Sequence, residues 1–171
     1  IIFKEAIFNN YENNLLIIKW INSGLLEVNW SIKIDPVSSV MLVVVCVISS
    51  LVHIYSIGYM SHDPHKPRFM AYLSLFTFSM LMLVTSDNFL QLFFGWEGVG
   101  LCSYFLIGFW FKKDSANAAA IKAFLVNRIG DFGFALGIFL IFYLFDTVNY
   151  NEVFSQIPQS VNKEISFIGI T

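Results

Sequence analysis

The sequence predicts an all-α polytopic membrane protein, in which four antiparallel transmembrane helices follow a short interfacial β-hairpin. Of the 171 residues 57% are hydrophobic and only 13% are charged, with a mean hydropathy of +0.68. A soluble domain has roughly 25% charged residues. The apolar residues also gather in four long runs separated by short polar breaks, which is typical of membrane-spanning helices. The net charge of −2 argues against nucleic acid as a partner.

We expect residues 1–35 to form a loop with a hairpin on the outer face of the membrane. Apolar residues alternate from Leu26 to Ile34, which is the period of a strand. An earlier apolar run, residues 15–20, ends at the turn-forming sequence Asn22-Ser23-Gly24. Trp20 and Trp30 suit the membrane interface. An amphipathic helix is the alternative.

The four apolar runs predict helices at about 36–60, 69–86, 89–111 and 116–145. The first run has no charge and is long enough to cross a core of roughly 30 Å at about 1.5 Å per residue. Asp35 and Pro36 predict its start, as N-cap and first helical residue. Residues 146–171 are expected to be a polar, irregular tail on the outer face, and residues 165–171 are candidates to begin a further span.

The cations predict an orientation. The 61–68 loop carries Lys66 and Arg68, and the 112–115 loop carries Lys112 and Lys113, whereas the Asp87-Asn88 turn has no cation. Cytoplasmic and matrix loops are enriched in Lys and Arg, so both basic loops are expected inside and both chain ends outside.

Only four of the 22 formal charges (10 basic and 12 acidic) fall within the predicted spans: Glu97, Lys122, Arg128 and Asp131. Ionised groups are costly in hydrocarbon, so these four are the candidate functional residues. Burial favours the neutral form of Glu97, whereas a nearby cation favours its carboxylate. Glu97 can therefore exchange a proton when the cation moves. The alternative is a static carboxyl that holds helices together.

Arg128 and Asp131 are three residues apart, so they share a helix face and can pair along it. An internal ion pair without proton transfer is the alternative reading. Arginine stays charged in proteins, so Arg128 is expected to act as a fixed electrostatic element. Lys122 lies nine residues before Asp131, on the opposite face, and either snorkels to the surface or has a buried role.

Small residues predict where helices approach closely. Gly95 and Gly98 flank Glu97, and Gly133 with Gly137 forms a GxxxG pattern. The sequence contains no phosphate loop, nucleotide fingerprint, haem motif or nucleophile triad. We expect neither a metal site nor a cofactor on this chain.

Three stretches carry a resemblance that covers about Asp35 to Phe145. The sequences DPVSSVMLVVVCVISSLVHIYSIGYMSHDPHKPRF, LVTSDNFLQLFFGWEGVGLCSYFLIGFWF and KAFLVNRIGDFGFALGIF closely resemble the subunit 5 family of NADH dehydrogenase, the antiporter-like membrane subunits of respiratory complex I. The first 34 residues and the tail match only in general character. The resemblance implies that the four spans are helices three to six of a larger antiporter-like helix bundle.

The resemblance also implies a function. The chain would be a subunit of a proton-translocating NADH:ubiquinone oxidoreductase, with no redox active site of its own. Glu97 would be a protonatable residue of the pathway, and Arg128 and Asp131 would tune it. NADH, FMN, iron-sulfur clusters and ubiquinone would bind elsewhere in the complex. The partners would be other membrane-arm subunits and lipids.

The family subunit is much longer than this chain, and the lysine that it pairs with the glutamate lies on a later helix. We therefore expect a second chain or a missing segment to supply the remaining helices. The start at Ile1, with no basic region before it, suggests a processed end or an internal fragment. The high Phe, Ile, Asn and Lys content favours the mitochondrial inner membrane, with both basic loops on the matrix side, over the bacterial plasma membrane. The alternatives are a subunit of a multi-subunit cation/proton antiporter and a helix-packing fragment without proton transfer.

Overall fold

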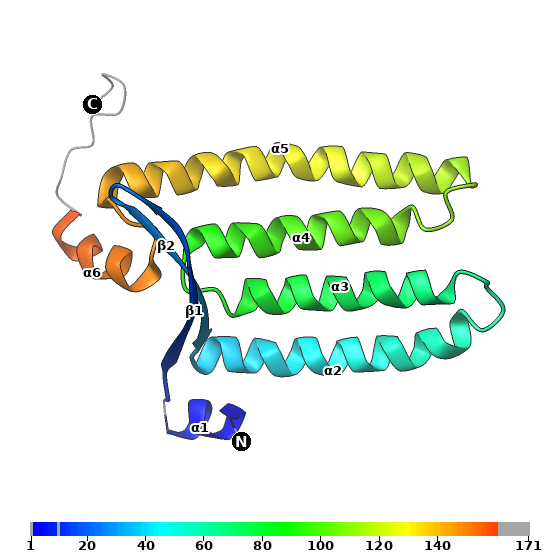
Figure 1. Ribbon diagram of the computed structural model, residues 1–171, viewed down its shortest axis with the longest axis horizontal. Helices are drawn as coiled ribbons and strands as arrows, with labels where there is room; N and C mark the ends of the chain where they lie inside the picture. The colour runs from blue at the N-terminus through cyan, green and yellow to red at the C-terminus, as the bar shows by residue number, and fades with distance from the viewer. Residues whose placement is uncertain (1, 10, 161–171) are drawn as a thin grey trace.

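The computed structural model describes residues 2–9 and 11–160 and contains four long helices (Figure 1). Each is long and apolar enough to cross a membrane. The prediction of four antiparallel transmembrane helices is confirmed. They are α2 (Pro36–Tyr59), α3 (Lys66–Val84), α4 (Phe89–Ile107) and α5 (Asp114–Phe145).

The four helices lie side by side in chain order and form a single layer (Figure 1). Among them, the extensive contacts join helices that are consecutive in the chain. Between 6% and 17% of the apolar window of each helix is buried within the chain. Both faces of the layer are therefore largely uncovered in the part of the chain that the structure describes.

At two places the helix ends differ from the predicted ones by three residues or more. Helix α3 begins at Lys66, because Pro67 is tolerated in the first helical turn, and it therefore includes Arg68. Helix α4 ends at Ile107, and residues 108–113 form the connection to α5. At the start of α2, the side chain of Asp35 accepts a hydrogen bond from the Ser38 amide, and the Ser38 hydroxyl accepts one from the Asp35 amide, which forms a capping box.

The predicted hairpin is confirmed, and the alternative of an amphipathic helix is wrong. Strands β1 (Asn13–Ser23) and β2 (Leu26–Ile34) pair antiparallel, with Ser23 opposite Leu26. Gly24 in the turn has a φ of +61°, a conformation that glycine adopts without strain. A short helix that we did not predict, α1 (Ile2–Phe8), precedes the hairpin.

The hairpin packs across the ends of the long helices, away from the basic loops (Figure 1). Val28 of β2 forms a buried cluster with Ile138 of α5 and Val148. Gln91 of α4 is fully buried and bonds the strand backbone twice: it donates to the Ser31 carbonyl at 2.7 Å and accepts from the Ser31 amide at 3.0 Å. The side-chain amide of Gln91 thereby pairs with the backbone of Ser31 as a neighbouring strand would, and it holds the hairpin on α4.

Residues 150–160 form a helix, α6 (Tyr150–Ser160), so the prediction of an irregular tail is wrong for this part. Its residues alternate apolar and polar at the helical period, but Pro158 in the last turn and the many polar side chains made the segment resemble a loop. Residues 161–171, including the candidate start of a further span, lie outside the described residues.

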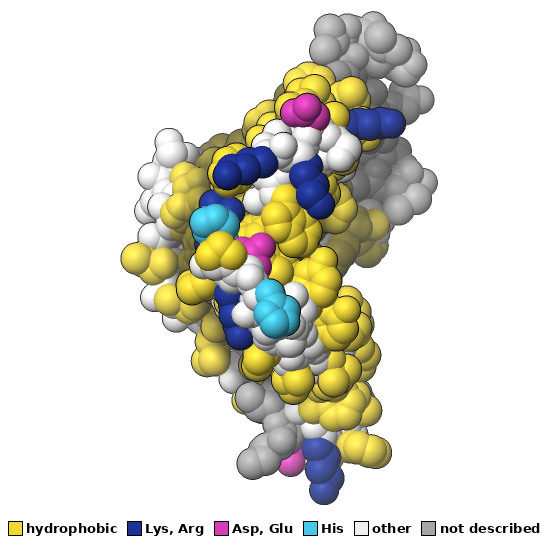
Figure 2. All heavy atoms as spheres, turned by 90° about the vertical axis from the view of Figure 1, so that its right-hand side faces the viewer, with side chains coloured by type: hydrophobic (Ala, Val, Ile, Leu, Met, Phe, Trp, Pro, Cys, Tyr) yellow, Lys and Arg dark blue, Asp and Glu magenta, His cyan; other side chains and the backbone are white. Residues whose placement is uncertain are grey.

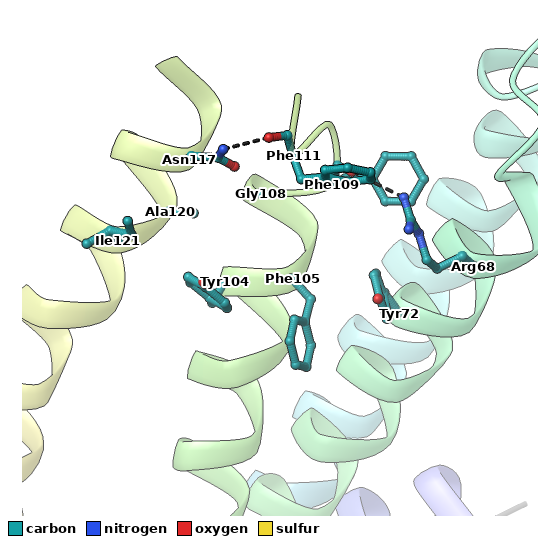
Figure 3. A pocket seen from close by; sticks show the side chains of 10 residues that line it. All are labelled: Arg68, Tyr72, Tyr104, Phe105, Gly108, Phe109, Phe111, Asn117, Ala120 and Ile121. Atoms are coloured by element: carbon teal, nitrogen blue, oxygen red, sulfur yellow. Dashed lines mark hydrogen bonds between the residues drawn. The ribbon is translucent and has the colours of Figure 1, made fainter. Parts of the chain in front are cut away.

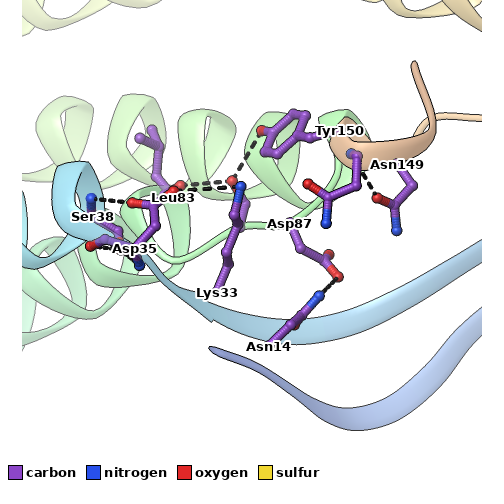
Figure 4. Close-up of polar contacts among 10 residues, drawn as sticks. Asn14, Lys33, Asp35, Ser38, Leu83, Asp87, Asn149 and Tyr150 are labelled. Atoms are coloured by element: carbon purple, nitrogen blue, oxygen red, sulfur yellow. Dashed lines mark hydrogen bonds and ion pairs between the residues drawn. The ribbon is translucent and has the colours of Figure 1, made fainter. Parts of the chain in front are cut away.

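The Asp87-Asn88 turn joins the hairpin, α4 and α6 (Figure 4). The Asp87 carboxylate accepts a hydrogen bond from the Asn14 side chain at 2.9 Å. The backbone carbonyl of Asp87 accepts one from the Tyr150 amide at 3.1 Å. Burial raises the pKa of the Tyr150 hydroxyl, against the opposing effect of a hydrogen bond with Ser86. The turn is thus a buried polar junction, and Asn88 adds the N-cap of α4 by accepting from the Gln91 amide.

Candidate functional site

The candidate site lies between α4 and α5, near the middle of both helices. Glu97 follows the start of α4 at Phe89 by eight residues, or about 12 Å. Its carboxylate forms an ion pair with Nη1 of Arg128, which comes from α5. Both residues were predicted to lie in spans, but their pairing was not predicted.

Arg128 also reaches a second carboxylate. Its Nε lies 3.6 Å from Oδ2 of Asp131, one turn further along α5, as the spacing predicted. The indole N–H of Trp96 donates to Oδ1 of the same carboxylate at 2.8 Å. The guanidinium carbon lies 4.6 Å from the centre of the Phe124 ring, which adds a cation–π contact. One guanidinium is therefore shared by two carboxylates from two helices.

Burial differs among the three charged side chains. The exposed fraction is 8% for Asp131, 24% for Glu97 and 36% for Arg128 within this chain. Two carboxylates and one guanidinium sum to a net formal charge of −1 when all are ionised. The cluster is neutral only when it gains one proton or another cation.

Lys122 is not part of this cluster. It is exposed on α5, and it forms no ion pair with any residue that the structure describes. It lies six residues before Arg128, or about 9 Å along the axis toward the basic loops. The predicted separation of Lys122 from Arg128 and Asp131 agrees with these positions.

The glycines fall into two groups. A Cβ added to Gly95 would lie 2.7 Å from the Cα of Leu83, and one added to Gly98 would lie 2.7 Å from the Ser79 hydroxyl. These two glycines let α3 approach α4 closely. No described atom lies within 4 Å of a Cβ added to Gly133 or Gly137. The GxxxG face on α5 is therefore uncovered in the described part, and its packing role stays a prediction.

The antiparallel connection explains why Glu97 and Arg128 meet. Glu97 lies sixteen residues before Lys113 and Arg128 lies fifteen after it, so a hairpin of two helices folded at that break brings them level. The same rule relates Trp96 to Asp131, and Phe93 to Phe134, whose ring centres lie 5.5 Å apart. Counting residues in both directions from Lys113 would therefore have predicted the Glu97–Arg128 pair.

A second polar group was missed, between α2 and α3. The hydroxyls of Ser49 and Thr77 lie 2.7 Å apart. Nδ1 of His53 lies 2.7 Å from the Ser49 carbonyl oxygen, and its Nε2 lies 3.3 Å from the Ser74 hydroxyl. No residue of this group has a fixed charge, so charges within the spans gave no signal for it.

The two basic loops lie at one end of the layer and contact each other. The Trp110 indole donates to the Asp63 carboxylate at 3.2 Å, and Arg68 donates to the Phe109 carbonyl at 3.3 Å. Figure 2 shows Lys and Arg side chains gathered on this end together with histidines. The predicted orientation requires this shared end. Among the described residues no group of three or more His, Cys, Asp and Glu side chains is placed to hold a metal ion.

Two family models match the chain. Residues 20–70 match the N-terminus of NADH-ubiquinone oxidoreductase (complex I) chain 5, and residues 86–171 match the NADH:quinone oxidoreductase/Mrp antiporter transmembrane family. The second match covers half of the chain and contains all four candidate residues.

Curated relatives agree with these matches. The chain is 53% identical over 167 residues to NADH-ubiquinone oxidoreductase chain 5 of Chondrus crispus, covering 98% of this chain and 25% of the relative. It is 63% identical over 141 residues to the chain 5 of Triticum aestivum, covering 82% and 21%. It is 55% identical over 160 residues to NADH-quinone oxidoreductase subunit L of Rhodobacter capsulatus, covering 90% and 22%.

The chain spans about a quarter of the length of these relatives. The four membrane helices, the two family matches and the relatives agree with one another. The chain is a multi-pass membrane protein that belongs to the complex I chain 5 family, within the wider NADH:quinone oxidoreductase/Mrp antiporter family of transmembrane domains.

Proposed function

We propose that this chain forms part of the proton-translocating membrane arm of an NADH:quinone oxidoreductase, in which Glu97 accepts and releases a proton. The observation that carries the proposal is the sharing of one guanidinium, that of Arg128, by the carboxylates of Glu97 and Asp131 in the middle of two membrane helices. The relatives are named as subunits of NADH-ubiquinone or NADH-quinone oxidoreductase.

The charge balance of the cluster supports a mobile proton. An uncompensated negative charge is costly in the low dielectric of the membrane interior. The cluster has one carboxylate more than it has cations, so a proton on one carboxyl removes the excess. A cation brought near by another segment of the complex would have the same effect. Such a cation would expel the proton, and its withdrawal would let a proton bind again.

The guanidinium of Arg128 can pair with either of the two carboxylates. Its Nη1 contacts Glu97, whereas its Nε lies 3.6 Å from Asp131 and has no hydrogen-bond partner among the described residues. Trp96 holds the other oxygen of the Asp131 carboxylate at 2.8 Å. We infer that Asp131 is the fixed acceptor. A small rotation of the guanidinium toward Asp131 would leave Glu97 without its cation, and Glu97 would then take up a proton.

The remaining assignments follow from this role. NADH, FMN, iron-sulfur clusters and the quinone would bind to other parts of the complex, and quinone reduction there would drive the movement of Arg128. The membrane would be the mitochondrial inner membrane or a bacterial plasma membrane, with both basic loops inside. Lys122 lies on α5 between those loops and the cluster, and it would belong to the inner part of the pathway.

A cation/proton antiporter is the second candidate, because the family that matches residues 86–171 includes Mrp antiporters. The match of residues 20–70 to complex I chain 5 favours the respiratory complex. Sodium-dependent proton transport by the purified assembly without NADH oxidation would reverse that preference.

The test is Glu97→Gln in the full-length subunit, within the intact complex reconstituted into vesicles. Glutamine keeps the size and the hydrogen-bonding capacity of Glu97 but cannot carry a proton. We expect fewer protons pumped for each NADH oxidised. Glu12→Gln is the matched control, because Glu12 is an exposed carboxylate at the edge of the hairpin. A Glu97→Gln complex that assembles and pumps with the wild-type ratio would contradict the proton role.

A further inference from the structure

A pocket of about 430 Å³ lies at the basic end of the layer, between α3, α4 and α5 (Figure 3). It is separate from the charged cluster, because its walls come from the first two turns of α3 and of α5, the last turn of α4 and the connection that follows it. Its polar rim and its deeper wall differ in character. The residues that matter here are Arg68 and Asn117 at the rim, and Tyr72, Tyr104, Phe105 and Ile121 below it.

Arg68 has unused hydrogen-bonding capacity. Its Nη2 donates to the Phe109 carbonyl at 3.3 Å, while its Nε is buried without a hydrogen-bond partner among the described residues. The guanidinium carbon lies 4.7 Å from the centre of the Phe109 ring and 5.6 Å from that of Phe111. These contacts fix the guanidinium at the pocket without neutralising it.

The nearest carboxylate does not complete the site. Asp63 accepts from the His65 amide at 2.7 Å and from the Trp110 indole at 3.2 Å, and it forms no ion pair with Arg68 within 4.0 Å. The two loops and the adjoining helix ends, residues 61–68 and 108–115, carry four cations against the carboxylates of Asp63 and Asp114. An anion at the pocket is therefore favoured by the whole end of the molecule.

We propose that this pocket binds an anionic phospholipid, whose phosphate lies against Arg68 and whose acyl chain follows the wall formed by Tyr104 and Ile121. The pocket lies at the ends of the spans, where lipid headgroups meet the hydrocarbon. Basic pockets between transmembrane helices suit anionic headgroups, and arginine binds phosphate through two N–H groups at once. This inference does not depend on proton transfer by Glu97.

The test uses the intact purified complex and a photoactivatable phosphatidylglycerol with the reactive group in its acyl chain. After irradiation, label is measured on the peptide that contains residues 104–121. We expect Arg68→Gln to reduce this labelling about tenfold, since it removes a charge-assisted contact. Lys112→Gln, which removes an exposed cation at the same end but not in the pocket, should stay within about twofold of wild type.

A second variant keeps the test decisive if Arg68→Gln fails to assemble. Ile121→Trp narrows the lower wall and leaves Arg68 in place, and it should also reduce labelling by the phosphatidylglycerol probe. Equal labelling by a phosphatidylcholine probe would overturn the proposal, because that lipid is not anionic. Loss of labelling when millimolar inorganic phosphate is present during irradiation would reassign the site to free anions. A crosslink from these residues to protein instead of lipid would show that another helix fills the pocket.

Discussion

Two pairs of neighbouring helices in the same apolar layer, α2–α3 and α4–α5, are joined by different kinds of polar contact. Between α2 and α3 the polar contacts use the hydroxyls of Ser49 and Thr77, with His53 beside them. Between α4 and α5 they use two carboxylates and a guanidinium. Both pairs of helices pack side by side, so the charges are not needed merely to join helices.

The energies of the two kinds of contact support this reading. Hydrogen bonds between membrane helices contribute roughly 0.6–2 kcal/mol. A charged side chain at the centre of a membrane helix costs at least about 2.5–3.5 kcal/mol on insertion scales, and a partner offsets only part of that. The neutral contact of α2 and α3 is the less costly solution. The proton transfer that we propose for Glu97 would account for the more costly contact of α4 and α5.

The largest effect is expected for Arg128→Gln. The change leaves Glu97 and Asp131 without their common cation. Breaking a fully buried ion pair from one side costs roughly 3–5 kcal/mol, and the cost here should lie below that range because Glu97 and Arg128 are only partly buried. Hydrogen–deuterium exchange of the α4 and α5 peptides in the intact complex should show strongly increased local opening. The double variant Arg128→Gln with Glu97→Gln should recover part of the protection. Protection that is unchanged in the single variant would mean that the ion pair adds nothing to this contact.

The next effect concerns the contact between α3 and α4. Gly95→Ala would place a methyl group 2.7 Å from the Leu83 backbone, so the helices must separate. Overpacking of this kind costs roughly 1–3 kcal/mol. Gly133→Ala is the matched control, because no described atom lies within 4 Å of its added Cβ. Exchange of the α3 and α4 peptides should increase for the first variant only. An equal effect of Gly133→Ala would reveal a further helix on that face.

The smallest effect is expected for Ser49→Ala. It removes the 2.7 Å contact with Thr77 and a longer, 3.3 Å contact with Nδ1 of His53. The Thr77 hydroxyl stays bonded to the Leu73 carbonyl at 3.0 Å, and Nδ1 of His53 stays 2.7 Å from the Ser49 carbonyl oxygen. Loss of a neutral hydrogen bond costs about 1 kcal/mol. The same exchange measurement on α2 and α3 should show a small increase, and proton pumping should stay at the wild-type ratio. A pumping defect as large as that of Glu97→Gln would remove the contrast between the two contacts.

Hydropathy predicted the four membrane helices because each apolar run is long, and because charged or turn-forming residues separate each run from the next. The hairpin followed from strict alternation in β2. The short helix α1 was missed because seven residues carry little periodic signal. Helix α6 was missed because its polar residues and Pro158 resemble a loop when its packing beside Asp87 is unknown.

The candidate site was predicted in part. The Arg128–Asp131 pair follows from spacing on one helix, whereas the Glu97–Arg128 pair depends on how two helices are aligned. The Trp96 contact with Asp131 could not be read from residue types, because tryptophan near a membrane is expected at the interface. The twofold bonding of Gln91 to Ser31 depends on a strand that is sixty residues away in the sequence. No local pattern signals a contact at that distance.

The single layer of consecutive helices also has a consequence for biogenesis. Because the extensive contacts among α2–α5 join only neighbours in the chain, each of these helices can pack as soon as it follows its predecessor into the bilayer. The hairpin behaves differently, since β2 binds Gln91 and shares its buried cluster with Ile138 and Val148. It must wait for α4 and α5 to be synthesised. Synthesis of residues 11–34 thus precedes their docking by the length of four helices, and the closing of this end is the late step in maturation of the segment.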